Sequence, residues 1–280
     1  MLPKWIVTIY ASGPIVAENR FNFTKRKDIN TAHALYSNIK VMNAHGGGLI
    51  IELNVYAKNH NLAEKAAFTF LGYAFDVLSF KLNLPIELSV FDRRQSQRDQ
   101  FPIRREITIK EFSDSFDESR LLRLTEPFFL NAHSWFRKGL ISENPIDKYL
   151  AFWNSIEILA ANYHIKSEKT KKGIKNQVWS IFHELFGETE NWKTVILDYD
   201  NWINKTYFLR KEIAHGSGDI GETEFIESIL DSTEELQIIS MALLRKWRKD
   251  KLITNSKITD NIEKKLDPVN WFHFGQTNLN

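Results

Sequence analysis

The sequence contains no cysteine among its 280 residues. This absence excludes disulfides, thiol nucleophiles and cysteine-ligated metal sites, and it suits a reducing compartment. Long apolar runs are also missing, since no stretch approaches the roughly 18 consecutive apolar residues of a membrane-spanning helix. The N-terminal segment is too short and too alternating for a signal peptide, and Lys4 and Trp5 lie inside it. We therefore expect a cytoplasmic protein without a membrane span.

The short motifs of several large enzyme classes are absent as well. The sequence has no Walker A loop, no dinucleotide fingerprint, no His-Glu-x-x-His and no Gly-x-Ser-x-Gly nucleophile elbow. His133, His164 and His183 stand singly in helical segments, where core or surface positions are commoner than metal ligation. We expect no metal ion and no cofactor.

Charge and tryptophan divide the chain into two parts. Residues 1–112 carry 15 Lys and Arg against 10 Asp and Glu, whereas residues 113–280 carry 22 against 25. Seven of the eight tryptophans lie in the second part. These shifts predict an N-terminal domain over 1–112, a second domain over 113–250 and a loosely organised tail over 251–280, with the boundary near Ser113-Asp114-Ser115.

The first part has the pattern of a small mixed α/β domain. Its β-rich or alternating segments, which predict strands, are 5–10, 49–56, 86–91 and 105–109. Asn61 is expected to cap a helix, because alanine and large apolar residues recur after it at helical spacing until Leu84-Pro85. A small sheet covered by one long helix is the simplest layered solution.

The second part has the pattern of an all-helical domain. Helices are predicted over 121–140, 145–164, 174–186, 202–214 and 222–249. Asn144-Pro145 supplies an N-cap followed by proline at the first helical position. Because the connections are short, we expect an antiparallel bundle, and an α+β fold class for the chain as a whole.

Arg210 and His215 form the strongest chemical signal in the sequence. They close an apolar-periodic segment that Gly216 follows directly. An arginine can hold a phosphate, and a histidine near a helix end can move a proton at neutral pH, so the pair could cleave RNA through the ribose 2′-hydroxyl. Positions five apart lie about 140° apart on a helix, so the two side chains converge only if the helix ends or bends, or across a dimer. The alternative is a surface arginine and a histidine that interacts favourably with the helix dipole.

The string from Tyr207 to Gly216, with Leu209-Arg210 and then Ile213-Ala214-His215-Gly216, resembles the Apea-like branch of the HEPN superfamily. An earlier aromatic-rich helix, Tyr149 to Leu159, carries Glu157 and also resembles that branch. The order and separation of the two segments match, and the resemblance covers about residues 120–250.

The resemblance implies a HEPN-like helical bundle that acts as a metal-independent endoribonuclease. It implies a homodimer, and a toxin–antitoxin or antiphage setting with an antitoxin or defence-system partner. Arg210 would bind the scissile phosphate, His215 would transfer protons, and Glu157 would orient one of them or shape the cleft. The sequence departs from the pattern at Lys211, where active members often have a small polar residue, and Ser217 stands where another branch has a modified tyrosine.

Lysines add a possible contact with RNA. The segment 166–175 contains five lysines and one glutamate, and it is either a phosphate-gripping loop or a solvated connection. The residues predicted to bind RNA are Lys169, Lys171, Lys172, Lys175 and Lys211. A second basic cluster, Arg93 to Arg98 with Arg104-Arg105, is either a nucleic-acid surface or a polar loop between strands.

Three functions therefore stay open. The first is a ribonuclease whose N-terminal domain gates activity or senses a trigger. The second is a non-catalytic bundle that binds RNA or protein, which Lys211 favours. The third is a scaffold subunit, which the abundance of aromatic residues on apolar faces favours.

Overall fold

A computed structural model describes residues 2–29, 34–45, 47–91, 104–189, 192, 199–215 and 223–252. The chain divides into two compact units between Leu121 and Leu122. The predicted boundary near Ser113 falls earlier, inside a helix of the first unit. Most of the predicted tail, from residue 253 onward, lies outside the described residues.

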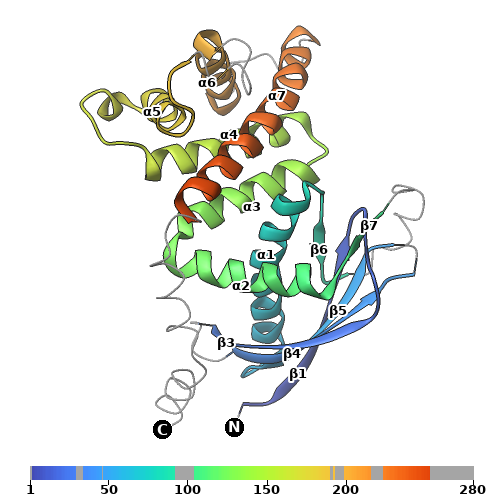
Figure 1. Ribbon diagram of the computed structural model, residues 1–280. Helices are drawn as coiled ribbons and strands as arrows, with labels where there is room; N and C mark the ends of the chain where they lie inside the picture. Colours follow the sequence, from blue (N-terminus) through green and yellow to red (C-terminus); the bar gives the residue numbers. More distant parts are fainter. Residues whose placement is uncertain are drawn as a thin grey trace. The chain divides into compact units, whose positions relative to one another are not determined.

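The first unit is built on a five-stranded antiparallel sheet in the order β3-β4-β5-β1-β6 (Figure 1). Its strands are β1 (Lys4–Ser12), β3 (Phe21–Ile29), β4 (Ala34–Asn43), β5 (Leu49–Tyr56) and β6 (Glu87–Ser89). β2 (Ile15–Ala17) and β7 (Arg105–Ile107) form a separate parallel pair. The prediction found β1, β5, β6 and β7 but missed the other three strands.

One face of the sheet is buried under helix α1 (His60–Leu82). Along β5, Leu49, Ile51, Leu53 and Val55 are buried while the residues between them are partly exposed, as the two-residue strand period requires. Asn59, rather than the expected Asn61, caps α1 by accepting a hydrogen bond from the Leu62 backbone N–H at 2.9 Å.

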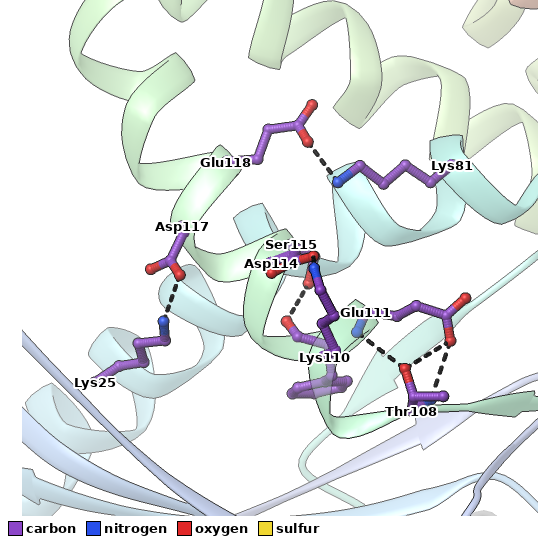
Figure 2. Close-up of polar contacts among 10 residues, drawn as sticks. Lys25, Lys81, Thr108, Lys110, Glu111, Asp114, Ser115, Asp117 and Glu118 are labelled. Atoms are coloured by element: carbon purple, nitrogen blue, oxygen red, sulfur yellow. Dashed lines mark hydrogen bonds and ion pairs between the residues drawn. The ribbon is translucent and has the colours of Figure 1, made fainter. Parts of the chain in front are cut away.

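Helix α2 (Ile109–Thr125) belongs to the first unit as far as Leu121, and this part has both aromatic and ionic contacts there. Buried Phe112 and Phe116 pack on an aromatic cluster of Phe21, Phe23, Phe70 and Phe75. Figure 2 shows two ion pairs that join α2 to its neighbours: Asp117 with Lys25 of β3 at 2.6 Å, and Glu118 with Lys81 of α1 at 2.5 Å.

The start of α2 is a capping box (Figure 2). The Thr108 hydroxyl accepts from the Glu111 N–H, and the Glu111 carboxylate accepts from the Thr108 N–H at 3.0 Å. This turn explains why the predicted strand over 105–109 ends at Ile107. The polar string Ser113-Asp114-Ser115 lies within the helix, and Ser115 is buried with its hydroxyl donating to the Phe112 carbonyl.

The second unit is helical, and it comprises α3 (Pro127–Ile141), α4 (Pro145–Tyr163), α5 (Ile174–Phe186), α6 (Tyr199–His215) and α7 (Thr223–Trp247). The prediction of one helix over 121–140 is wrong, because α2 ends at Thr125 and α3 begins at Pro127. A proline has no backbone N–H and disfavours helical geometry in the residue before it, so it starts a helix more easily than it continues one. The other four helices agree with their predicted spans to within a few residues.

Helix α4 is central in this unit, since it contacts α3, α5, α6 and α7. It starts where predicted, with the Asn144 side chain accepting from the N–H groups of Ile146 and Asp147. Its buried Ser155 meets Ser240 of α7 at 3.1 Å. The predicted order of the chain, a mixed α and β part followed by a helical part, is confirmed.

No helix in the described part of the chain is both long enough and apolar enough to cross a membrane.

Candidate functional site

The candidate site lies on the seam between α4 and α6, where three successive turns of α4 meet α6. Tyr149 contacts Thr206, Trp153 contacts Tyr207, and Glu157 contacts Arg210. The α4 residues are four positions apart, so they share one helix face. The predicted Glu157 and Arg210 are therefore brought together.

Tyr149 fixes the start of this seam. Its side chain is fully buried, and its hydroxyl donates to the Thr206 carbonyl at 2.6 Å. Burial, and then the charge of Glu235, raises the pKa of the Tyr149 hydroxyl above its ordinary value. The hydroxyl consequently keeps its proton and remains a hydrogen-bond donor.

In the part of the chain that the structure describes, Arg210 is held by Glu157 alone. Its Nε lies 3.6 Å from Glu157 Oε2, and the Trp153 indole N–H donates to that same oxygen at 2.5 Å. The exposed fractions of the Arg210 and Glu157 side chains are 31% and 26%. Within the described residues, the two terminal amino groups of Arg210 have no hydrogen bond or ion pair. In arginines that bind phosphate, these groups form the bidentate hydrogen bonds.

His215 is the last described residue of α6, and its side chain is exposed. The helix continues through His215, so no break before it turns the imidazole toward Arg210. Five residues of α-helix separate the two side chains by about 140° around the axis. One copy of α6 therefore presents Arg210 to α4 and His215 to another side. Gly216, which was expected to release the histidine, lies outside the described residues, as does Ser217.

His215 instead belongs to an exposed stripe along α6. Asn204, Phe208, Lys211 and His215 are all exposed, and their spacing places them within about 60° of one another around the helix. Phe208 is 61% exposed. The stripe combines an aromatic ring with a cation and an imidazole, a combination suited to contact with RNA or with a protein.

The predicted lysine segment, 166–175, contains a turn held by hydrogen bonds rather than a loose connection. Thr170 is buried, and its hydroxyl accepts from the Ser167 N–H at 2.9 Å, while its carbonyl accepts from the Gln177 side chain. Lys169, Lys171 and Lys172 are exposed around this 3₁₀ turn, Thr170–Lys172. Lys171 forms a largely exposed ion pair with Glu168 at 2.5 Å.

Lys175, at the start of α5, links this turn to α6. Its Nζ donates to Asn204 Oδ1 at 2.6 Å and lies 5.9 Å from the centre of the Tyr207 ring. The Tyr207 ring in turn lies 6.3 Å from the Trp153 ring. Lys175 therefore lies beside the seam that holds Arg210, whereas Lys211 lies on the exposed stripe.

Sequence reasoning did not assign Trp153, Tyr207 or Phe208 to the site. For Trp153 a signal was present, since it precedes Glu157 by four positions and i,i+4 side chains meet on a helix. Phe208 gave no such signal, because the sequence does not show which apolar residue on a helix is left exposed.

The remaining candidates lie apart from the seam. His133 is buried on α3 beside Phe129, His164 is the C-cap residue of α4, and the His183 ring stacks on Trp179 at 5.4 Å. Of the second basic cluster, Arg104 and Arg105 belong to the first unit, whereas 93–98 lies outside the described residues. Arg105 pairs with Glu111 at the start of α2.

Across the part of the chain that the structure describes, no group of three or more His, Asp or Glu side chains is placed to hold a metal ion. Comparisons of this chain with family models, with curated proteins and with solved structures found no match.

Proposed function

We propose that the helical unit is a HEPN-like bundle that cleaves RNA without a metal ion. Arg210 binds the phosphate, His215 transfers protons, and Glu157 orients Arg210. The observation that carries this proposal is the Arg210–Glu157 pair, in which the carboxylate holds the guanidinium at Nε and leaves its terminal amino groups without a partner among the described residues. A guanidinium fixed in this way loses less conformational entropy when it binds a phosphate.

The lysines support RNA as the substrate. Lys169 and Lys172 are exposed on a turn fixed by Thr170, and Lys175 lies beside the Arg210 seam. Cations displayed on a fixed turn attract the phosphate backbone without reading its sequence, and their attraction falls with salt.

The active unit in this proposal is a homodimer. Because Arg210 and His215 lie about 140° apart on one helix, a shared site needs Arg210 of one copy and His215 of another. A twofold axis would then produce two equivalent composite sites. A toxin or defence role, with an antitoxin or defence-system partner, would follow if the cleaved RNA is cellular or viral.

The first test is cleavage of structured and single-stranded RNA in EDTA. Wild type should cleave, and Arg210→Ala and His215→Ala should each reduce the rate by about 100-fold or more. Matched controls are Arg245→Ala, which removes an exposed cation from α7, and His60→Ala in the first unit; both should cleave at the wild-type rate.

The second test asks whether the site is shared between copies. An equal mixture of the two inactive variants, after subunit exchange, should recover about one quarter of the wild-type activity, since half the dimers hold one intact site of two. No recovery, with wild type active, would mean that a single chain supplies both groups.

A second candidate function is a non-catalytic module that binds RNA. The exposed stripe Phe208, Lys211 and His215 favours it, because this stripe is on a different side of α6 from Arg210 and contains a lysine beside the motif arginine. Salt-dependent RNA binding without cleavage, weakened by Phe208→Ala and Lys211→Ala, would support the module. Absence of both binding and cleavage would leave the scaffold hypothesis.

A further inference from the structure

We propose that Trp153 is a positioning residue for the Arg210 guanidinium and acts through Glu157. The effect of Trp153 on catalysis rests on the proposed function. The contacts of Trp153, Glu157 and Arg210 can be measured in a protein without any activity. The proposal rests on one partly buried hydrogen bond, one ion pair, and two terminal amino groups that have no partner among the described residues.

The hydrogen bond from Trp153 fixes one oxygen of Glu157. The Trp153 side chain is completely buried, and its only polar atom, Nε1, donates to Glu157 Oε2 at 2.5 Å. The Glu157 carboxylate is partly exposed, and in isolation it would sample several rotamers. The indole therefore selects one position of the carboxylate.

That selected oxygen is the one that faces Arg210. Glu157 Oε2 accepts from Trp153 and lies 3.6 Å from Arg210 Nε, so it has a neutral donor on one side and a cation on the other. Without the indole donor, the carboxylate would be free to rotate toward water. A half-exposed ion pair of this kind is weak by itself.

Trp153 itself is held in place by the seam. The Tyr149 hydroxyl bonds to the Thr206 carbonyl one turn earlier, and the Tyr207 ring lies against Trp153. Lys175 Nζ lies on the Tyr207 ring and donates to Asn204. The position of Arg210 thus depends on buried packing between α4 and α6 rather than on its own exposed side chain.

Nuclear magnetic resonance of the side chains tests the arrangement directly. In Trp153→Phe, which keeps an aromatic ring but removes the N–H donor, the Arg210 Nε–Hε resonance should shift toward that of a solvated arginine and exchange faster with water. In Glu157→Gln, both this resonance and the Trp153 indole N–H resonance should move. Trp179→Phe, at an exposed indole of α5, is the matched control and should move neither.

RNA cleavage tests whether the Trp153 hydrogen bond contributes to catalysis. Trp153→Phe should lower kcat roughly tenfold, the size of effect expected from one hydrogen bond to a charged group, and change KM little. In an Arg210→Ala background the same substitution should cause no further loss, because its effect passes through Arg210. A purely structural role would reduce activity in both backgrounds.

The outcomes separate the two proposals. An Arg210 Hε resonance that is unchanged in Trp153→Phe overturns the positioning role, even if wild type cleaves RNA. Movement of that resonance in a protein that cleaves no RNA supports the positioning of Arg210 and contradicts the ribonuclease. Should Trp153→Phe fail to fold, Glu157→Gln decides, since an unmoved Trp153 indole resonance there is incompatible with the proposed hydrogen bond.

Discussion

At the scale of single residues, the proposed function gives Glu157 a role that differs from that of an ordinary surface ion-pair partner. Glu157→Gln should lower the free energy of unfolding by less than about 1 kcal/mol, because both partners are partly exposed. It should nevertheless lower kcat for RNA, since the guanidinium loses its fixed orientation. Urea denaturation and single-turnover kinetics measure the two effects.

Glu168→Gln is the matched control for this prediction. It breaks the more exposed ion pair with Lys171, at the lysine turn, and should change neither stability nor kcat. Equal losses of kcat in the two variants would mean that the Glu157 carboxylate acts only through its negative charge and does not orient Arg210.

Tyr149 gives a prediction for alkaline pH. Burial, followed by the charge of Glu235, raises the pKa of its hydroxyl above the ordinary value of 10.0. Its contribution to stability is therefore complete below pH 10.0 and is lost as the pH rises above it. In Tyr149→Phe, stability should fall by about 1 kcal/mol at pH 7 and decline less steeply at high pH. Thermal unfolding from pH 7 to 11 checks both, and an unchanged slope would contradict the role of this hydroxyl.

At the scale of elements, the capping box of α2 is a testable unit. Hydrogen bonding from Thr108 and the nearby Arg105 guanidinium outweigh burial and hold the pKa of Glu111 below its ordinary value of 4.5. Its stabilising effect is present above pH 4.5 and is lost as the pH falls below that value. Thr108→Ala should cost about 1 kcal/mol at pH 7.

Glu111→Gln should flatten the fall in stability between pH 5 and 3, measured by urea denaturation. Glu64→Gln, which alters an exposed carboxylate near the start of α1, is the control and should leave that fall unchanged. A similar flattening in both variants would show that the total carboxylate charge, and not the capping box, causes the fall in stability at acid pH.

The helices and strands that the sequence predicted are those whose apolar residues recur at a regular spacing and whose ends are marked by capping or turn residues. Strand β5 alternates strictly, and α4 begins with Asn144-Pro145. Strand β3 was missed because Lys25, Arg26, Lys27 and Asp28 follow one another in it, which removes the apolar alternation from its second half. The break between α2 and α3 was missed because Pro127 lies inside one continuous apolar pattern.

The site was predictable only in part, for a similar reason. Spacing named Arg210 together with His215, and the family resemblance added Glu157, which the structure brings to Arg210. The separation of His215 from Arg210 follows from helix geometry, but the burial of Trp153 and the exposure of Phe208 depend on which faces of α4 and α6 meet. Tertiary packing, rather than local pattern, decides these.

At the scale of the whole molecule, each unit has its own core. Phe116 lies in the aromatic cluster of the first unit and Phe152 in the core of the second. Phe116→Ala should destabilise the first unit by about 3–5 kcal/mol. Hydrogen exchange should then show lost protection in the sheet and α1, with α4 and α7 still protected, because separate cores give separate cooperative units.

Phe152→Ala should produce the reverse pattern. Loss of protection throughout the chain in either variant would show that the two units unfold as one.

The seam between α4 and α6 gives the number of residues between Arg210 and His215 a consequence for the proposed dimer. The seam anchors α6 at Thr206, Tyr207 and Arg210, so a deletion after Arg210 would leave these contacts in place and rotate the residues that follow it, including His215. Deleting one residue there, such as Ala214, would reduce the angle from about 140° to about 40° and bring the histidine onto the arginine side of the helix. Under the proposed function, the natural five-residue step places each site between two chains, and we predict that a chain shortened by one residue would carry both groups on one side of α6.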